Sequence, residues 1–159
     1  MSIKIKRIRK NSIYREFSVR FSNCRYGWMG ISLHHYDITV FYASISGVYN
    51  PFYDYVEMLE NIKKTNNRTF NLFIDQEGFD GSMSVKVMGK FLELTTETLK
   101  DNLGKYDIEK NTIRISKKVF LKSMKMSLLE FYKKNKTCMN DDEFYDLSFP
   151  LFQLRKLKV

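Results

Sequence analysis

Short segments in which apolar and polar residues alternate recur along this chain, and each predicts a β-strand with one buried face. In residues 16–23, the apolar Phe17, Val19 and Phe21 alternate with polar side chains. The same pattern occurs in residues 28–34, 37–48, 69–74, 82–88 and 90–96; residues 111–115 are a candidate last strand, and residues 99–109 are ambiguous. Because short turns join most of these segments, neighbouring strands are expected to pair antiparallel.

One helix has clear signals at both ends. Asn50 can accept hydrogen bonds from the free amides of the first turn, and Pro51 has the backbone angle that a first helical position needs. Apolar residues then form one stripe at helical spacing, namely Phe52, Tyr55, Val56, Leu59 and Ile62. A second helix is expected from Lys117 to Lys134, with Ser116 as its cap.

The order of three strands, a helix, three strands and a helix predicts an α+β fold. We expect a mainly antiparallel β-sheet of about six strands packed with two amphipathic helices. The length of 159 residues suits one hydrophobic core. The sequence therefore predicts a single domain over residues 1–159, with a basic N-terminal segment at 1–12 and a C-terminal extension at 137–159.

The sequence indicates neither a membrane protein nor an exported one. Its longest apolar runs are far shorter than the roughly 20 residues that cross a bilayer. No apolar stretch follows the basic N-terminus, as a signal peptide would require. Cys24 and Cys138 are isolated, which indicates neither a disulfide framework nor a zinc site and suits a reducing compartment. We expect a cytoplasmic location.

Residues suited to catalysis are few and scattered. His34 and His35 are adjacent, so on a strand their side chains would point to opposite faces. A small hydrolase that uses Cys24 with one of these histidines is the enzymatic alternative, although no nucleophile motif surrounds Cys24. No glycine-rich phosphate loop occurs either. We therefore expect no enzymatic activity and no cofactor.

Three acidic residues, Asp75, Glu77 and Asp80, cluster in a predicted turn. Oxygen ligands at such spacing suit a hard cation, but the six-ligand pattern of an EF-hand is absent. Acidic residues are also ordinary in a solvated hairpin. The expectation is that no metal ion binds here.

The net charge of +9 is concentrated near the ends of the chain. Five of the 27 basic residues lie in residues 1–10 and three in 155–158, so the segment between them carries 19 basic and 18 acidic residues. Within it, lysines crowd the predicted second helix and its end: Lys117, Lys118, Lys122, Lys125, Lys133, Lys134 and Lys136, against a single Glu130. This helix supports an alternative function, a small nucleic-acid-binding or regulatory module, although no RNA-recognition or helix-turn-helix motif is visible.

Residues 47–62, GVYNPFYDYVEMLENI, resemble a pattern in small bacterial proteins of toxin-immunity loci. In those proteins a strand ends in an aromatic residue and leads through Asn/Asp-Pro-Phe into an amphipathic helix. Residues 73–78, FIDQEG, are similar to the strand end that follows this helix. The resemblance extends over about residues 38–132. It implies a non-enzymatic immunity protein, as in contact-dependent growth inhibition systems, that binds and blocks a cognate toxin domain.

Binding of a toxin domain requires exposed aromatic anchors and complementary charges. Tyr53 lies off the apolar stripe of its helix, and Phe79 is an apolar residue within an acidic turn. The alternative is that these aromatic residues cover the core beneath loops. The predicted partner-binding residues are Tyr49, Tyr53, Asp54, Asp75, Glu77, Phe79 and Asp80.

Overall fold

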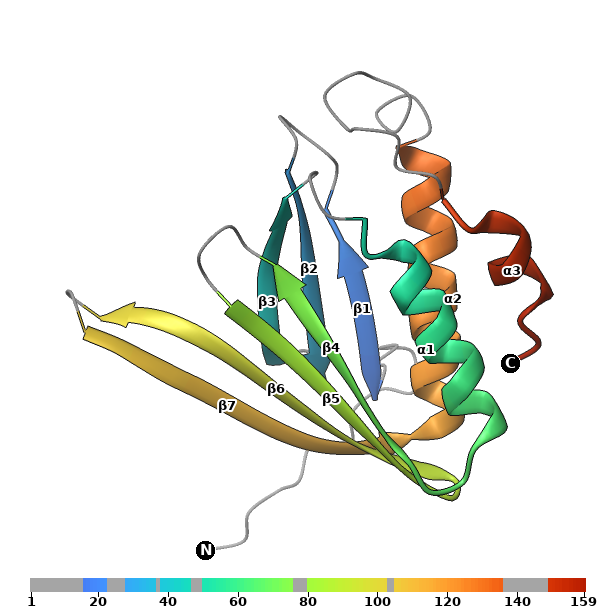
Figure 1. Cartoon of the computed structure of the whole chain (residues 1–159), viewed down its shortest axis with the longest axis horizontal. Helices are drawn as coiled ribbons and strands as arrows, with labels where there is room; N and C mark the ends of the chain where they lie inside the picture. The colour runs from blue at the N-terminus through green and yellow to red at the C-terminus, as the bar shows by residue number, and fades with distance from the viewer. Residues whose placement is uncertain are drawn as a thin grey trace, which may run out of the picture.

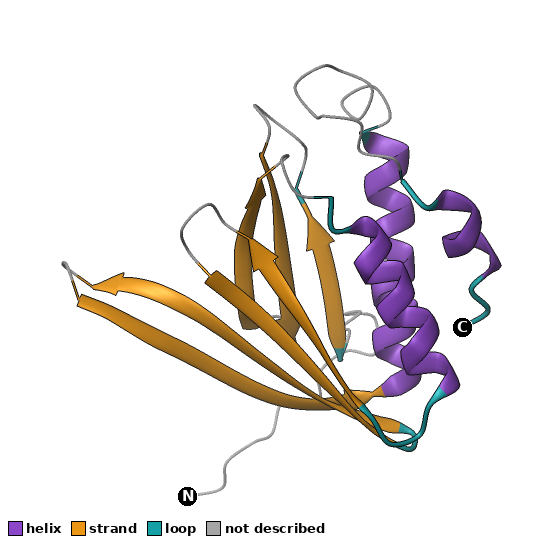
Figure 2. Cartoon of the chain, in the orientation of Figure 1, coloured by secondary structure: helices purple, strands orange, loops and turns teal. Residues whose placement is uncertain are grey.

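The computed structural model describes residues 16–22, 28–36, 38–46, 50–75, 80–102, 105–135 and 149–159. Two antiparallel sheets and three helices make up these residues (Figures 1 and 2). The first sheet contains β1 (Phe17–Phe21), β2 (Trp28–His35) and β3 (Ile38–Ser46), and the second contains β4 (Thr69–Asp75), β5 (Asp80–Met88), β6 (Phe91–Asn102) and β7 (Lys105–Ser116). The helices are α1 (Phe52–Lys64), α2 (Lys117–Lys134) and α3 (Leu151–Lys156).

The predicted α+β class with mainly antiparallel strands is confirmed, and the seven strands are close to the expected number. The strands form two sheets of three and four, because β3 passes into α1 and does not pair with β4. The ambiguous segment 99–109 belongs to β6 and β7. Their pairing continues to Asn102 and Lys105, four residues beyond the last pair of β5 with β6.

The start of α1 follows the predicted capping chemistry with a shift of one residue. The helix begins at Phe52, whose N–H donates to the Asn50 Oδ1 at 3.2 Å. The Pro51 carbonyl accepts the N–H of Tyr55 at 2.9 Å. The whole predicted stripe is buried, together with Met58. α1 thus turns one apolar face to the core and leaves the other face exposed.

Helix α2 follows β7 directly and covers the free edge of β1. Ser116 occupies the cap position, as predicted, but its side chain makes no capping hydrogen bond. Ser123 and Ser127, one helical turn apart, donate their hydroxyls to the carbonyls of Phe17 at 2.9 Å and Val19 at 2.7 Å. An exposed strand edge invites pairing with other chains, and these two hydrogen bonds close part of it.

The other edge of the first sheet meets the inner face of the second. The carbonyl of Val40 accepts hydrogen bonds from the Thr96 hydroxyl at 3.1 Å and from the Asn111 amide at 3.0 Å. Val40 lies where the register of β2 and β3 shifts, between Leu33 and His34 on the partner strand. Side chains on the second sheet thus satisfy a carbonyl that this irregularity removes from the ladder.

Within the predicted C-terminal extension, α3 packs against the body of the protein. Leu154 and Leu157 are buried in the same core as the two sheets and α2. The Phe149 ring lies 4.9 Å from the rings of both Phe52 and Tyr132. The Lys125 ammonium group donates to the Leu157 carbonyl. Residues 149–157 are therefore part of the packed structure.

Candidate partner-binding surface

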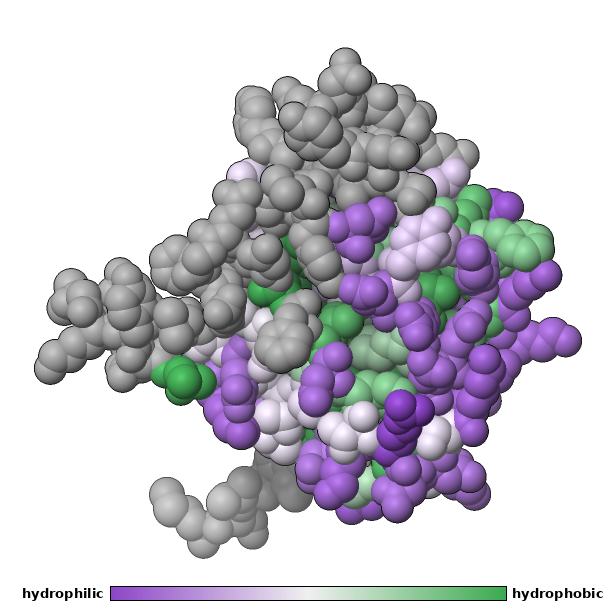
Figure 3. Space-filling view, in the orientation of Figure 1, coloured by the Kyte–Doolittle hydropathy of each residue, from purple (hydrophilic) through white to green (hydrophobic). Residues whose placement is uncertain are grey.

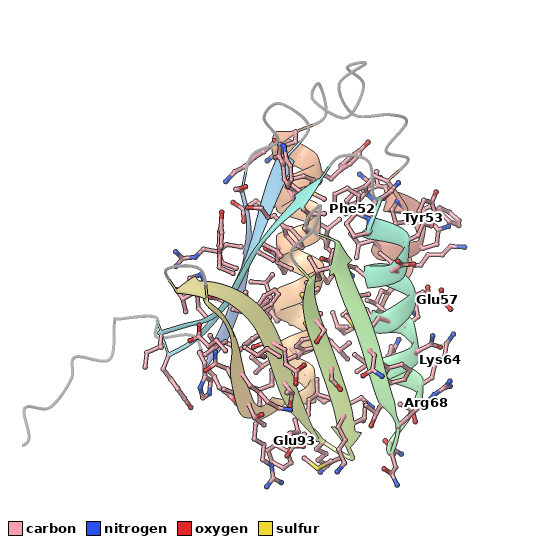
Figure 4. All side chains as sticks on the ribbon, turned by 60° about the vertical axis from the view of Figure 1, so that its left-hand side comes forward. Phe52, Tyr53, Glu57, Lys64, Arg68 and Glu93 are labelled. Carbon is pink, nitrogen blue, oxygen red and sulfur yellow. The ribbon has the colours of Figure 1, made fainter. Side chains whose placement is uncertain are left out.

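Two of the predicted partner-binding residues, Tyr53 and Asp54, lie exposed on the first turn of α1. The exposed fraction of Tyr53 is 46%, whereas its neighbour Phe52 is fully buried. Figure 4 shows Tyr53 and Glu57 along the outer side of α1. Tyr53 thus presents almost half of its surface to solvent, as a binding anchor requires.

Of the remaining predicted residues, only the backbone of Asp75 and Asp80 lies within the described part of the structure. Asp75 ends β4 and Asp80 begins β5, and the two are Cα partners in the hairpin, although their side chains lie outside the described part of the structure. Tyr49, Glu77 and Phe79 also lie outside the described residues. β4 returns antiparallel to α1, so the first turn of α1, the end of β4 and the start of β5 lie toward the same end of the molecule (Figure 1).

A shallow hollow of about 530 Å³ separates the exposed side of α1 from β4, an edge strand of the second sheet. The carboxylates of Asp54 and Glu57 lie on its helix side. On its strand side, the Arg68 guanidinium lies 5.3 Å from the centre of the Phe70 ring. The described residues that line it are Asp54, Glu57, Met58, Asn61, Arg68, Thr69, Phe70, Asn71 and Leu72. We call this feature the α1–β4 groove; it offers carboxylates, amides and an aromatic ring for recognition of a polar, partly basic surface.

Sequence reasoning missed most of this groove. Glu57 and Asn61 could have been found as residues opposite the apolar stripe of α1. Arg68 and Asn71 had no such signal, because the alternation of a strand does not reveal whether the strand lies at a sheet edge.

The lysines of α2 do not form one free basic face. The ammonium group of Lys117 donates to the Thr65 carbonyl, and that of Lys125 donates to the carbonyl of Leu157. Lys134 forms an ion pair with Glu130 at 2.7 Å. Three of the six lysines within α2 therefore contact other groups of the protein. The nucleic-acid alternative stays a prediction.

The histidines are placed as the strand pattern predicts, in adjacent positions at the end of β2. The His34 ring nitrogens lie 3.0 Å from the Ser32 hydroxyl and 3.2 Å from the Thr39 hydroxyl. The His35 ring packs against Tyr36 at 4.6 Å. Cys24 and Cys138 lie outside the described residues. The enzymatic alternative that joins Cys24 to a histidine is therefore untested.

In the described ranges, no three His, Cys, Asp or Glu side chains gather closely enough to hold a metal ion. No helix of that part of the chain has the length and apolar character that a membrane span requires.

Comparisons with known proteins add no family assignment. No protein-family model matches the sequence, and no curated protein matches it. A solved structure of the plant transcriptional regulator PBF-2 aligns over 77% of this chain and 76% of its own, with 12% sequence identity and a TM-score of 0.39. A likeness at this level carries no argument about fold or function.

Proposed function

We propose that this protein binds and neutralises a cognate bacterial toxin domain by protein–protein contact, without catalysis and in the cytoplasm. The resemblance of residues 47–62 to proteins of toxin-immunity loci supports the proposal. The observation that carries it is the first turn of α1, where exposed Tyr53 and Asp54 stand directly beside a fully buried Phe52. This turn lies within the segment that bears the resemblance.

The first turn of α1 is held rigidly, as a binding anchor should be. Phe52 packs between the rings of Phe131 at 5.3 Å and Phe149 at 4.9 Å. The Asn50 side chain holds the first free amide of the helix. The backbone that carries Tyr53 is therefore already ordered before binding, which lowers the conformational entropy that binding through this turn costs.

The chemistry of the surface favours a partner with basic groups. Tyrosine is enriched among the residues that dominate interface energies. Carboxylates at Asp54 and Glu57 border the α1–β4 groove and complement lysine or arginine side chains. We therefore infer that the toxin presents a basic patch beside a depression that accepts the Tyr53 ring.

Coexpression with the product of the neighbouring upstream gene tests the proposal. We expect the two proteins to purify as a complex and the host cell to survive the toxin only when this chain is present. A neighbouring product that neither binds this chain nor loses its toxicity beside it would contradict the proposal.

A further inference from the structure

A second hollow, which includes Lys63 in the last turn of α1, is lined by lysines that come from four different segments. It has a volume of about 810 Å³. The lysines are Lys63 at the end of α1, Lys90 in the β5–β6 turn, Lys117 and Lys118 at the start of α2, and Lys158 after α3. The other described residues of its lining are Asn66, Gly89, Ser116, Leu121 and Val159, so no Asp or Glu of the described part of the chain lines it. We call this feature the lysine hollow.

The walls of the lysine hollow are tied together by hydrogen bonds. The Gly89 N–H donates to the Asn66 carbonyl at 2.8 Å, and the Lys117 N–H donates to the Lys90 carbonyl at 2.9 Å. The Lys117 ammonium group donates to the carbonyl of Thr65. These contacts fix the backbone of the loop after α1, the β5–β6 turn and the start of α2 relative to one another. The lysines are therefore brought together by the fold before any ligand arrives.

The positive charge at the start of α2 is unfavourable for that helix. The first turn of α2 contains no acidic residue and begins with Lys117 and Lys118. Cations near a helix N-terminus oppose the helix dipole, where an anion would be stabilising. The carboxylate of Glu16 accepts the Ser116 N–H at 3.2 Å, but Glu16 lines a different hollow on the β1 side of α2. Among the described residues, the side chains that line the lysine hollow thus carry five positive charges and no negative charge.

The hollow also has open space at its turn. Gly89 has a φ of +61°, and a Cβ placed on it would meet no atom within 4 Å. Lys63, Lys90, Lys118 and Lys158 form no ion pair among the described residues. Their ammonium groups can therefore turn toward a ligand without breaking an existing contact.

We propose that the lysine hollow binds a compact anion made of linked phosphate groups, such as a triphosphate chain. Five lysines around a concavity complement several negative charges held close together, and lysine serves as a point charge for phosphate. A nucleic-acid strand spreads its charges along an extended backbone and is better matched by a basic track than by lysines gathered around one hollow. This inference is independent of the proposed toxin binding.

Calorimetric titration of the full chain with inorganic tripolyphosphate tests the site, with ATP as a second titrant. A double variant Lys90→Gln/Lys118→Gln removes two charges from the hollow. The matched control, Lys122→Gln/Lys133→Gln, removes two charges from exposed positions of α2 outside it. We expect the hollow variant to bind tripolyphosphate at least about tenfold more weakly and the control to bind within about twofold of wild type.

The two titrants distinguish the source of the phosphate chain. Equal affinities would indicate recognition of the phosphate chain alone, and tighter binding of ATP would indicate a nucleotide. Either result supports the site, provided that Lys90→Gln/Lys118→Gln weakens binding and the control variant does not. The hollow variant should unfold at a temperature no lower than wild type without ligand, because its change relieves repulsion between like charges.

Three results would overturn the proposal. The first is an absence of tripolyphosphate binding at millimolar concentration. The second is an equal loss of affinity in the hollow and control variants, because binding would then follow net charge only. The third is a single-stranded oligonucleotide that binds more tightly than tripolyphosphate and depends on the same two lysines.

Discussion

Phe52 and Tyr53 are neighbours in the sequence with opposite environments, one fully buried and the other 46% exposed. Phe52→Ala should lower the free energy of unfolding by about 3–5 kcal/mol, because it leaves a cavity between the rings of Phe131 and Phe149. Tyr53→Ala should change it by no more than about 0.5 kcal/mol. Urea denaturation of both variants checks this. Equal destabilisation would show that Tyr53 is a core residue.

Gly89 is the first residue of the two-residue turn between β5 and β6 and has a φ of +61°. Gly89→Ala should lower the free energy of unfolding by about 1 kcal/mol or more, because a Cβ is strained in the left-handed region even without a steric neighbour. Lys90→Ala, at the next position, is the control and should stay within about 0.5 kcal/mol of wild type. A stability of Gly89→Ala equal to that of the control would contradict this account of the turn.

Single residues differ in how well the sequence predicts them. The roles of Asn50 and Pro51 at the helix start and the burial of the α1 stripe could be predicted, because capping and helical spacing depend on residues close together in the sequence. The exposure of Tyr53 followed from the same spacing. Arg68 of the α1–β4 groove could not be predicted, since its role depends on the position of β4 at a sheet edge.

At the scale of elements, the contact between α2 and β1 depends on two serine hydroxyls. Replacement of both Ser123 and Ser127 by Ala should lower the free energy of unfolding by roughly 2 kcal/mol, because the carbonyls of Phe17 and Val19 lose their donors. Equilibrium denaturation measures the change.

The matched control for this pair is Ser82→Ala/Ser84→Ala on β5, whose side chains face away from the core. We expect it to remain within about 0.5 kcal/mol of wild type. If the two double variants were equally stable, the hydroxyls of α2 would not contribute to the attachment of β1.

The two sheets are joined through the carbonyl of Val40. Thr96→Val should lower the free energy of unfolding by about 1 kcal/mol, and Asn111→Ala should weaken the same contact. The double variant should lose more than the sum of the two single losses, because only then does the buried carbonyl lack both donors. A double-mutant cycle by urea denaturation measures this coupling. Strict additivity would mean that the two donors act independently.

The positions of most strands and of α1 and α2 could be predicted from sequence, whereas α3 and the long ends of β6 and β7 were missed, and the association of the strands could not be predicted. Alternation shows which residues of a strand share a face and says nothing about which strand lies beside it. The separation into two sheets therefore emerged only from the structure. Ser123 and Ser127 likewise read as ordinary polar positions, although they hold α2 against β1.

At the scale of the whole molecule, some charged side chains on the outward face of the second sheet have partners on the same sheet. Glu97 pairs with Lys110 at 2.8 Å, and the Arg114 guanidinium lies 4.7 Å from the centre of the Phe91 ring. Polar side chains also gather on the side of the molecule where α1 and α3 lie (Figure 3). The two surfaces that we propose as binding sites differ in charge: the first turn of α1 carries the carboxylate of Asp54, and the lysine hollow carries ammonium groups.

The binding of the toxin domain encoded by the upstream neighbouring gene, measured by calorimetry, tests the central claim most directly. The site variant is Tyr53→Ala/Asp54→Asn. The control is Tyr42→Ala/Glu93→Gln, with an exposed tyrosine and a glutamate on the two sheets. The account predicts a Kd raised about 100-fold by the site variant and changed less than about threefold by the control. A site variant that binds as tightly as wild type would contradict it.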